Sequence, residues 1–308
     1  MRMAVIGVGH LGRHHARLLS ATPGVELVAV VDVDRERAAG VAGEYGAQPY
    51  AEWRDVVGKI DAATVAAPTE THAEIAEALL ESGVHVLIEK PMTRTTAEAD
   101  RLLRVAAQRG VTLAVGHTER FNPAVAQAKP MIRDARFIEV HRLGTFPDRS
   151  LDIDVVFDLM IHDLDLVLDI VGSEVTAVEA VGVPVLTPRV DIANVRLRFA
   201  TGCIANLTAS RISRDRVRKI RFFQRDAYVS VDYGAQELEV YRLVPKPGQM
   251  PVIEGGKLAI AREEPLKREL EDFVEAIRSG RAPGVTGQQG RAALALAERV
   301  VERMEMTR

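Results

Sequence analysis

The chain has 308 residues, 47% of them hydrophobic and 27% charged, which is typical of a globular protein long enough for two domains. Its formal net charge of −3 gives no electrostatic reason to bind nucleic acid or an anionic membrane, so we expect neither as a partner. Cys203 is the one cysteine, which excludes an internal disulfide framework. No apolar run approaches the ~18 residues that span a bilayer. Glycine also follows the N-terminus too closely for a signal peptide, so we expect a cytoplasmic protein.

A strand, a glycine-rich turn and a helix are predicted first, from the sequence MAVIGVGHLGRHHARLL. The glycines have the spacing and the strand–helix context of a dinucleotide-binding loop. Gly7 permits the tight turn, Gly9 lets the backbone approach a pyrophosphate, and Gly12 allows close packing of helix on strand. Unpaired amides at the helix N-terminus favour that anion. We expect this loop, with His10 and Leu11, to bind the cofactor.

A second apolar strand runs into Asp32, twenty residues after Gly12. A carboxylate at this position can accept hydrogen bonds from the ribose diol of NAD. Arg35 could instead pair with the 2′-phosphate of NADP. Asp32 and Asp34 would repel that phosphate, so we expect NAD, with NADP as the alternative cofactor.

Strands and helices keep alternating over residues 61–117, with short Gly or Pro joints. This pattern predicts an α/β fold with a doubly wound parallel sheet, whose ligands bind beyond the carboxyl ends of the strands. The residues expected at that edge, beside the glycine loop, are Pro68, Thr69, Glu89, Lys90 and His117. We expect the first four of them to contact the cofactor.

His72 lies in the first turn of the helix that follows Pro68. It either reaches the cofactor or only stabilises local structure, and the sequence does not decide between these roles.

The later part of the chain predicts successive strands from VRLRFATGCIANLTASRI, VRKIRFFQRDAYVSVDY and ELEVYRLV, with a hairpin turn at Thr201-Gly202. Two closing helices are predicted from LKRELEDFVEAIRSG and GQQGRAALALAERVVERME. Strands in succession argue for a separate second domain. We expect an NAD(P)-binding Rossmann domain at residues 1–121 and a substrate-binding and oligomerisation domain at residues 122–308.

The chain resembles the glucose-fructose oxidoreductase/inositol dehydrogenase (Gfo/Idh/MocA) family. The resemblance rests on VIGVGHLGRHHA, VAAPTETHAEIA, VHVLIEKPMTRTTAEAD, GHTERFNPAV and FDLMIHDLDLVL, in the order of the family. It implies a C-terminal α/β domain with a large, open, mostly antiparallel sheet that often makes subunit contacts. We therefore expect a homodimer or homotetramer that acts as an NAD(P)-dependent sugar, inositol or nucleotide-sugar dehydrogenase.

Asp158 and His162 lie four residues apart in a predicted helix, so both project from one face. A lone pair of this kind is usually a helix-start carboxylate and a satisfied histidine. The resemblance, however, places the family's substrate-contacting Asp and catalytic His at these two positions. His162 would accept the hydroxyl proton, and Lys90 would donate to the same oxygen. Asp158 either holds Lys90 charged or orients a substrate hydroxyl.

We expect the remaining polar residues to have surface or packing roles. We expect solvent exposure for Asp163 and Asp165, and a packing role for Cys203 in a β segment. The basic run at residues 210–221 is expected to be an exposed strand edge and loop. No His/Cys/Asp set has metal-ligand spacing, and hydride transfer needs no metal, so we expect none.

The stretches DRSLDIDVVFDLMIHDLD and KIRFFQRDAYVSVDY resemble the branch of the family that oxidises UDP-N-acetylglucosamine at its 3-hydroxyl. That branch usually carries glycine where this chain has Asp154, a difference that concerns the sugar pocket. Arg149, Lys219 and Arg221 are candidates for diphosphate contact, with a solvated surface role as the alternative. Other functions are an inositol or simple aldose dehydrogenase, or a non-catalytic NAD-binding regulator.

Overall fold

The computed structural model describes residues 1–146, 153–248 and 250–306, with side chains up to residue 304. Two compact units are formed, one from Met1–Thr118 with Leu266–Leu294, the other from Glu119–Pro265 with Ala295–Arg308. The first break lies close to the expected domain boundary at residue 121. The assignment of Leu266–Leu294 to the first unit differs from the expected division, which placed this segment in the second domain.

The first unit is built on a six-stranded sheet in the order β3-β2-β1-β4-β5-β6. Every neighbouring pair is parallel, as expected for a doubly wound α/β sheet. The strands are β1 (Arg2–Ile6), β2 (Glu26–Val31), β3 (Gln48–Tyr50), β4 (Ala62–Val65), β5 (His85–Glu89) and β6 (Leu113–Gly116). The helical segments are α1 (Gly12–Ser20), α2 (Arg35–Tyr45), η1 (Trp53–Val56), α3 (Thr69–Glu81), α4 (Thr96–Arg109), α7 (Pro265–Ser279) and the start of α8 (Gly287–Glu302).

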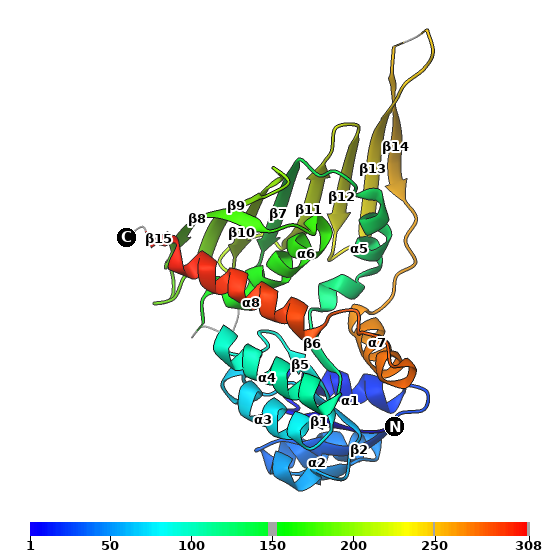
Figure 1. Cartoon of the computed structure of the whole chain (residues 1–308), viewed down its shortest axis with the longest axis vertical. Helices are drawn as coiled ribbons and strands as arrows, with labels where there is room; N and C mark the ends of the chain where they lie inside the picture. Colours follow the sequence, from blue (N-terminus) through cyan, green and yellow to red (C-terminus); the bar gives the residue numbers. More distant parts are fainter. Residues whose placement is uncertain (147–152, 249, 307–308) are drawn as a thin grey trace. The chain divides into compact units, whose positions relative to one another are not determined.

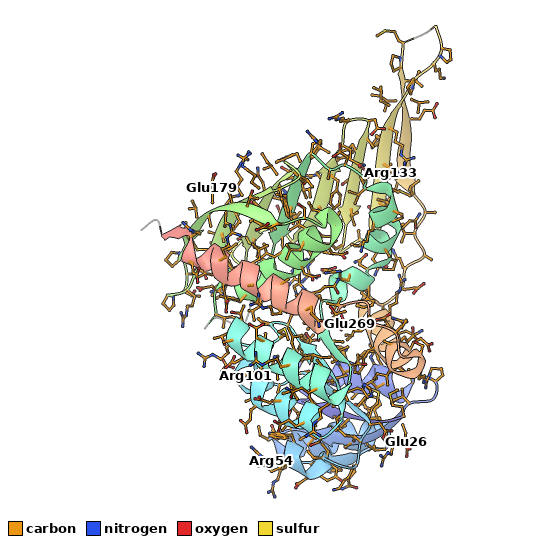
Figure 2. All side chains as sticks on the ribbon, viewed as in Figure 1. Glu26, Arg54, Arg101, Arg133, Glu179 and Glu269 are labelled. Carbon is orange, nitrogen blue, oxygen red and sulfur yellow. The ribbon has the colours of Figure 1, made fainter. Side chains whose placement is uncertain are left out.

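Local sequence signals define the helix ends in this unit. Thr95 and Glu98 form a capping box at the start of α4, and Gly110 ends the helix with a φ of 67°. Charged side chains such as Glu26, Arg54 and Arg101 are exposed (Figure 2). The strand interiors are apolar and buried, so the sheet supplies the core on which the helices pack.

Helix α7 belongs to the first unit because its apolar face completes that core. Leu270, Phe273 and Val274 are buried in one cluster with Met3 and Val5 of the first strand. The spacing of apolar residues along α7 predicts a helix with a buried face. It does not specify which sheet this face covers, so the sequence alone could not show that the segment belongs to the first unit.

The second unit contains a nine-stranded sheet in the order β14-β13-β12-β11-β7-β10-β9-β8-β15 (Figure 1). Its pairs are antiparallel except β10 with β7 and β15 with β8, which confirms the mostly antiparallel sheet. The strands are β7 (Phe137–Leu143), β8 (Val175–Val183), β9 (Ile192–Phe199), β10 (Ile204–Ser210), β11 (Val217–Phe223), β12 (Ala227–Asp232), β13 (Glu237–Val244), β14 (Val252–Leu258) and β15 (Met304–Met306). The helical segments are η2 (Thr118–Phe121), α5 (Pro123–Ala128), η3 (Lys129–Met131), the π-helical turn η4 (Val156–Met160) and α6 (Ile161–Val171).

The two faces of the nine-stranded sheet differ. On β7, Ile138, Val140 and Arg142 are buried, and the alternate residues Phe137 and Glu139 are only partly buried. Helices α5 and α6 lie over the buried face (Figure 1). No helix formed by the described residues of this unit covers the other face, and we call it the open face. Among the described residues, no helix is long and apolar enough to cross a membrane.

Candidate functional site

The glycine loop has the shape that a dinucleotide requires. Gly7 has a φ of 83°, and a Cβ there would lie 2.6 Å from the amide nitrogen of Ala67. A Cβ on Gly12 would overlap the carbonyl oxygen of Gly7, so only glycine lets α1 approach the loop this closely. A Cβ on Gly9 would meet nothing within 4 Å. Open space therefore adjoins the loop backbone at the start of α1, where a pyrophosphate would fit.

Asp32, at the end of β2, is held beside this loop. Its Oδ2 accepts a hydrogen bond from the amide of Val8 at 2.9 Å, and its Oδ1 accepts one from the amide of Asp34 at 3.0 Å. Nη1 of Arg37 lies 3.3 Å from both carboxylate oxygens. The arginine that contacts Asp32 is therefore Arg37.

The loop after β4 leads through Pro68 into α3, which begins at Thr69. His72, in the first turn of α3, is 1% exposed. Its Nε2 lies 2.8 Å from the carbonyl oxygen of Ala67, and its Nδ1 lies 3.0 Å from the carbonyl oxygen of Pro91. Burial lowers the pKa of His72, and the two carbonyl contacts oppose this effect, because a neutral ring can donate to only one of the two oxygens. Because both nitrogens face backbone carbonyls, this geometry favours the role in local structure over cofactor contact.

Glu89 and Lys90 lie at the carboxyl end of β5. Glu89 is 6% exposed, and its Oε1 lies 3.1 Å from Nε2 of His15 on α1. Its Oε2 accepts a hydrogen bond from the amide of Lys90 at 3.2 Å. Burial opposes ionisation of Glu89, but the contact with His15 and the charge of Lys90 outweigh it and hold its pKa below the usual range. Lys90 is partly exposed, and its peptide bond to Pro91 is cis.

His117 follows β6 and is 1% exposed. The first unit thus brings Gly7, Gly9, His10, Leu11, Gly12, Asp32, Pro68, Thr69, Glu89, Lys90 and His117 to the loops that follow its parallel strands.

Asp158 and His162 lie on one continuous helical segment of the second unit, and both are partly exposed. The segment begins as a π-helical turn, because the amide of Ile161 donates to the carbonyl oxygen of Val156 five residues earlier. The sequence predicted a regular α-helix throughout. A single π turn inside a helix is uncommon and is often found at functional sites.

Asp154 helps to form this turn. Its carbonyl oxygen accepts hydrogen bonds from the amides of Phe157 and Asp158, both at 3.1 Å. Its side-chain Oδ1 accepts one from the amide of Val190 at 3.0 Å. The residue that departs from the glycine of the UDP-sugar branch therefore has a structural role, joining the loop before β9 to the start of the helix.

The expectation of a solvated Asp163 was wrong. Asp163 is 1% exposed and forms a two-point ion pair with Arg142 of β7, at 2.7 Å from Nε and 3.0 Å from Nη2. Nη1 of Arg142 donates to Glu119 at 3.1 Å. The alternation of β7 could have indicated this, because Arg142 occupies an inward position after Ile138 and Val140.

The same expectation was wrong for Asp165, which is 1% exposed. Arg120 donates to its two oxygens at 2.6 and 2.7 Å, and also pairs with Asp169 at 2.6 Å. Helix α6, which carries His162, is therefore held by two arginines, the buried Arg142 and the partly buried Arg120. No local sequence signal identifies Arg120 as a partner, since it lies 45 residues before Asp165.

Lys219 and Arg221 lie on the open face of the nine-stranded sheet. Arg221 pairs with Glu139 at 2.6 Å, and Lys219 pairs with Asp232 at 3.4 Å. These contacts fit the surface role better than diphosphate contact. Arg149, the third candidate, lies outside the described residues. Cys203 is buried, which agrees with a packing role, and burial raises the pKa of its thiol to about 11.

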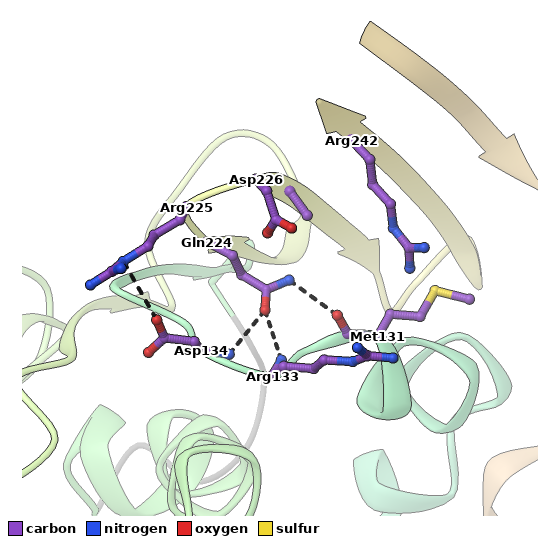
Figure 3. A pocket seen from close by; sticks show the side chains of 8 residues that line it. Met131, Arg133, Asp134, Gln224, Arg225, Asp226 and Arg242 are labelled. Atoms are coloured by element: carbon purple, nitrogen blue, oxygen red, sulfur yellow. Dashed lines mark hydrogen bonds and ion pairs between the residues drawn. The ribbon is translucent and has the colours of Figure 1, made fainter. Parts of the chain in front are cut away.

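A pocket of about 450 Å³ lies elsewhere in the second unit (Figure 3). The side chain of Gln224 joins the residues that line it. It accepts hydrogen bonds from the amides of Arg133 and Asp134 and donates one to the carbonyl oxygen of Met131. The pocket contains none of the predicted catalytic residues. Its lining residues are Met131, Arg133, Asp134, Gln224, Arg225, Asp226, Ala227 and Arg242.

Comparison with known families gives two matches along the chain. Residues 1–117 match the family described as "Oxidoreductase family, NAD-binding Rossmann fold", and residues 134–229 match the "GFO/IDH/MocA C-terminal domain". Together the matches cover the glycine loop, the Glu-Lys-Pro segment and the helix that carries Asp158 and His162.

Individual relatives match both units. The UDP-N-acetylglucosamine 3-dehydrogenase of Acidithiobacillus ferrooxidans is 41% identical over 304 residues, which cover 97% of this chain and 96% of the relative. The NAD(+)-dependent scyllo-inositol 2-dehydrogenase of Bacillus subtilis is 30% identical, over 93% of this chain and 89% of the relative. A solved structure of the Acidithiobacillus enzyme superposes with a TM-score of 0.92 at 40% identity, covering 99% of this chain and 97% of that one.

Proposed function

Because this chain belongs to the Gfo/Idh/MocA oxidoreductase family, we propose that it oxidises the 3-hydroxyl of UDP-N-acetylglucosamine with NAD as hydride acceptor. The protein is an NAD-binding oxidoreductase, and the identity of its substrate is the proposal. One observation carries it, the 41% identity over 97% of the chain to a relative with that activity. The alternative is oxidation of an inositol, supported by the 30% identical inositol dehydrogenase.

The chemistry requires a base, a hydrogen-bond donor and a hydride acceptor. NAD, when bound, would supply the acceptor for the hydride that leaves the carbinol carbon. We assign His162 to remove the hydroxyl proton as the C–H bond breaks and the carbonyl forms. We assign Lys90 to donate to the same oxygen and stabilise its partial negative charge. Asp158, four residues before His162, orients a sugar hydroxyl or the ammonium of Lys90.

The cofactor contacts follow from the loops of the first unit. We propose that the amides around Gly9 bind the pyrophosphate and that Asp32 contacts the ribose diol. This unit would bind NAD, and the second unit would bind the sugar. We also propose a cytoplasmic location, which the single buried Cys203 supports, since a reducing compartment needs no disulfide.

A substrate panel tests the proposed activity. NADH formation should be measured with NAD and, in parallel, UDP-N-acetylglucosamine, myo-inositol, scyllo-inositol and glucose, with a carbonyl-consuming aminotransferase to draw the reaction forward. We expect product with the UDP-sugar only. Product with an inositol or glucose only would select the alternative substrate class, and NAD binding without any turnover would support a regulator.

Cofactor preference should depend on the charge of Asp32. We expect the intact protein to bind NAD more tightly than NADP, and Asp32→Asn to narrow this preference. Asparagine can still accept from the amide of Val8, so the loop is kept while the charge that repels a 2′-phosphate is removed. Arg37 would keep its ion pair with Asp34 but lose the one with Asp32, so its guanidinium would be better able to pair with that phosphate. Titration of both cofactors by fluorescence measures the ratio, and equal affinities of the unmodified protein would contradict this role of Asp32.

A row of aromatic rings on the open face supports an oligomer. Phe137, Phe223, Tyr228 and Tyr241 follow one another across neighbouring strands, with ring centroids 5.6, 5.2 and 6.2 Å apart. Phe223 and Tyr241 are 36% and 40% exposed. We propose that a second copy of the chain covers this row in a homodimer or homotetramer.

The oligomer should respond to a charge placed within the aromatic row. We expect the intact protein to sediment as a dimer or tetramer at micromolar concentration, and Tyr228→Glu to shift it toward the monomer because a carboxylate would be desolvated there. Leu186→Glu is the control, because Leu186 is 63% exposed on a loop outside this row. A monomeric unmodified protein would argue against the proposal.

A further inference from the structure

Lys90 is attached to a buried chain of contacts that reaches α1. The amide of Lys90 donates to Oε2 of Glu89, and Oε1 of the same carboxylate lies 3.1 Å from Nε2 of His15. His15 is 0% exposed and Glu89 is 6% exposed. Both carboxylate oxygens of Glu89 are therefore used by groups of the protein.

Gly116 packs closely against the carboxylate of Glu89. A Cβ on Gly116 would lie 3.0 Å from Cδ and Oε1 of Glu89 and 3.1 Å from Oε2. The backbone of Gly116 is not in the left-handed region, so the absence of a side chain serves close approach and not chain geometry. The space around Glu89 is thus filled from β6 as well as from α1.

We propose that Glu89 is a positioning residue for Lys90, and that His15 and Gly116 hold Glu89 in place. A buried carboxylate is costly, and an ion pair there is weak evidence for added stability. Glu89 instead fixes the backbone of Lys90, which bears the reactive ammonium. The negative charge of Glu89 lies next to Lys90. The inference rests on the proposed function, since it concerns the catalytic use of Lys90.

The arrangement also ties the cofactor loop to the catalytic lysine. His15 lies on α1, whose first residue is the last glycine of the loop, and Glu89 ends β5. A displacement of α1 would move His15, then the carboxylate, then the amide of Lys90. Positional errors of about 1 Å at a reacting group cost on the order of a hundredfold in rate.

Matched variants separate positioning from cofactor contact. His15→Leu removes the donor to Glu89, and His15→Gln keeps an amide donor at similar reach. Gly116→Ala shifts the carboxylate without removing a charge. Gly43→Ala is the control, because a Cβ there would meet nothing within 4 Å. Glu89→Gln keeps the shape, but its amide cannot accept from both His15 and the amide of Lys90.

Steady-state kinetics, NAD affinity and the rate of Lys90 acylation should be measured on each variant, after circular dichroism has shown that the variant is folded. We expect Glu89→Gln and His15→Leu to lower kcat by roughly tenfold or more, with KM and NAD affinity changed less than threefold. His15→Gln should recover part of kcat, Gly116→Ala should lose several-fold, and Gly43→Ala should match the unmodified protein. Acylation of Lys90, followed by peptide mass spectrometry without substrate, should become at least threefold faster in Glu89→Gln, with Lys246 as an internal reference.

The outcomes distinguish this inference from the proposed function. NAD affinity that falls in step with turnover in Glu89→Gln would make Glu89 a cofactor contact and overturn the inference. Unchanged acylation of Lys90 in both Glu89→Gln and His15→Leu would also overturn it. If acylation changes as expected but Lys90→Ala keeps full turnover, the positional coupling stands and the catalytic role of Lys90 is wrong.

Discussion

Replacement of His162 by alanine should lower turnover by roughly a hundredfold or more, which is the usual scale for the loss of a general base. NAD affinity should stay nearly unchanged, because the proposed cofactor contacts lie in the glycine loop of the other unit. Steady-state assays of NADH formation give kcat, and fluorescence titration gives the dissociation constant of NAD. His141→Ala is a suitable control, since this histidine lies in β7 on the open face of the sheet.

The pH profile adds a second test of His162. A histidine base is lost by protonation, so kcat of the unmodified protein should fall as the pH drops below neutrality. Lys90→Ala should lower kcat without moving this acidic limb. Undiminished turnover in His162→Ala would remove the residue from the mechanism, and an acidic limb that persists in His162→Ala would assign the limb to another group.

Replacement of Arg142 by methionine should destabilise the second unit by about 3–5 kcal/mol, because it leaves the buried carboxylate of Asp163 and the partly buried carboxylate of Glu119 without their cation. Burial already raises the pKa of Asp163, against the opposing effect of Arg142. Urea unfolding followed by circular dichroism gives the free energy of unfolding, with the two units fitted as separate transitions if they resolve.

Two further variants decide what the Arg142 result means. Arg142→Met combined with Asp163→Leu should recover much of the lost stability, since a buried ion pair can be replaced by apolar residues at little cost. Arg221→Met should cost at most about 1 kcal/mol, because Arg221 and Glu139 are each about one-third exposed on the open face. Equal losses for Arg142→Met and Arg221→Met would show that burial of the Arg142 ion pair has no special importance.

The parts of the fold that could be predicted are those with short-range signals. The three glycines, the strand before them and the helix after them lie within 20 residues, and the structure forms them as predicted. The alternation of strands and helices likewise predicted the parallel sheet, and Thr201-Gly202 predicted the turn between β9 and β10, where Gly202 has a φ of 82°.

Long-range partners could not be predicted in the same way. His15 and Glu89 are 74 residues apart, and Arg142 and Asp163 are 21 apart. Periodicity shows which side of a strand or helix is buried, but it does not show which charged residue meets another in the folded protein. Acidic residues near His162 therefore gave the impression of a solvated surface. The π-helical turn was also not predicted, because the spacing of apolar residues indicates a helix but does not distinguish a bond across five residues from one across four.

Helix α7 lies late in the sequence but packs in the first unit, which has a consequence for synthesis on the ribosome. Residues 1–118 emerge early, but Leu270, Phe273 and Val274, which share the core of Met3 and Val5, are made only after another 150 or so residues. Domains generally fold as units in the order of their synthesis, and the first unit here cannot complete its core in that order. Nascent chains should therefore expose this apolar surface until most of the protein has been translated. Chains that stop before residue 266 would keep it exposed, which makes them natural targets for chaperones and proteases.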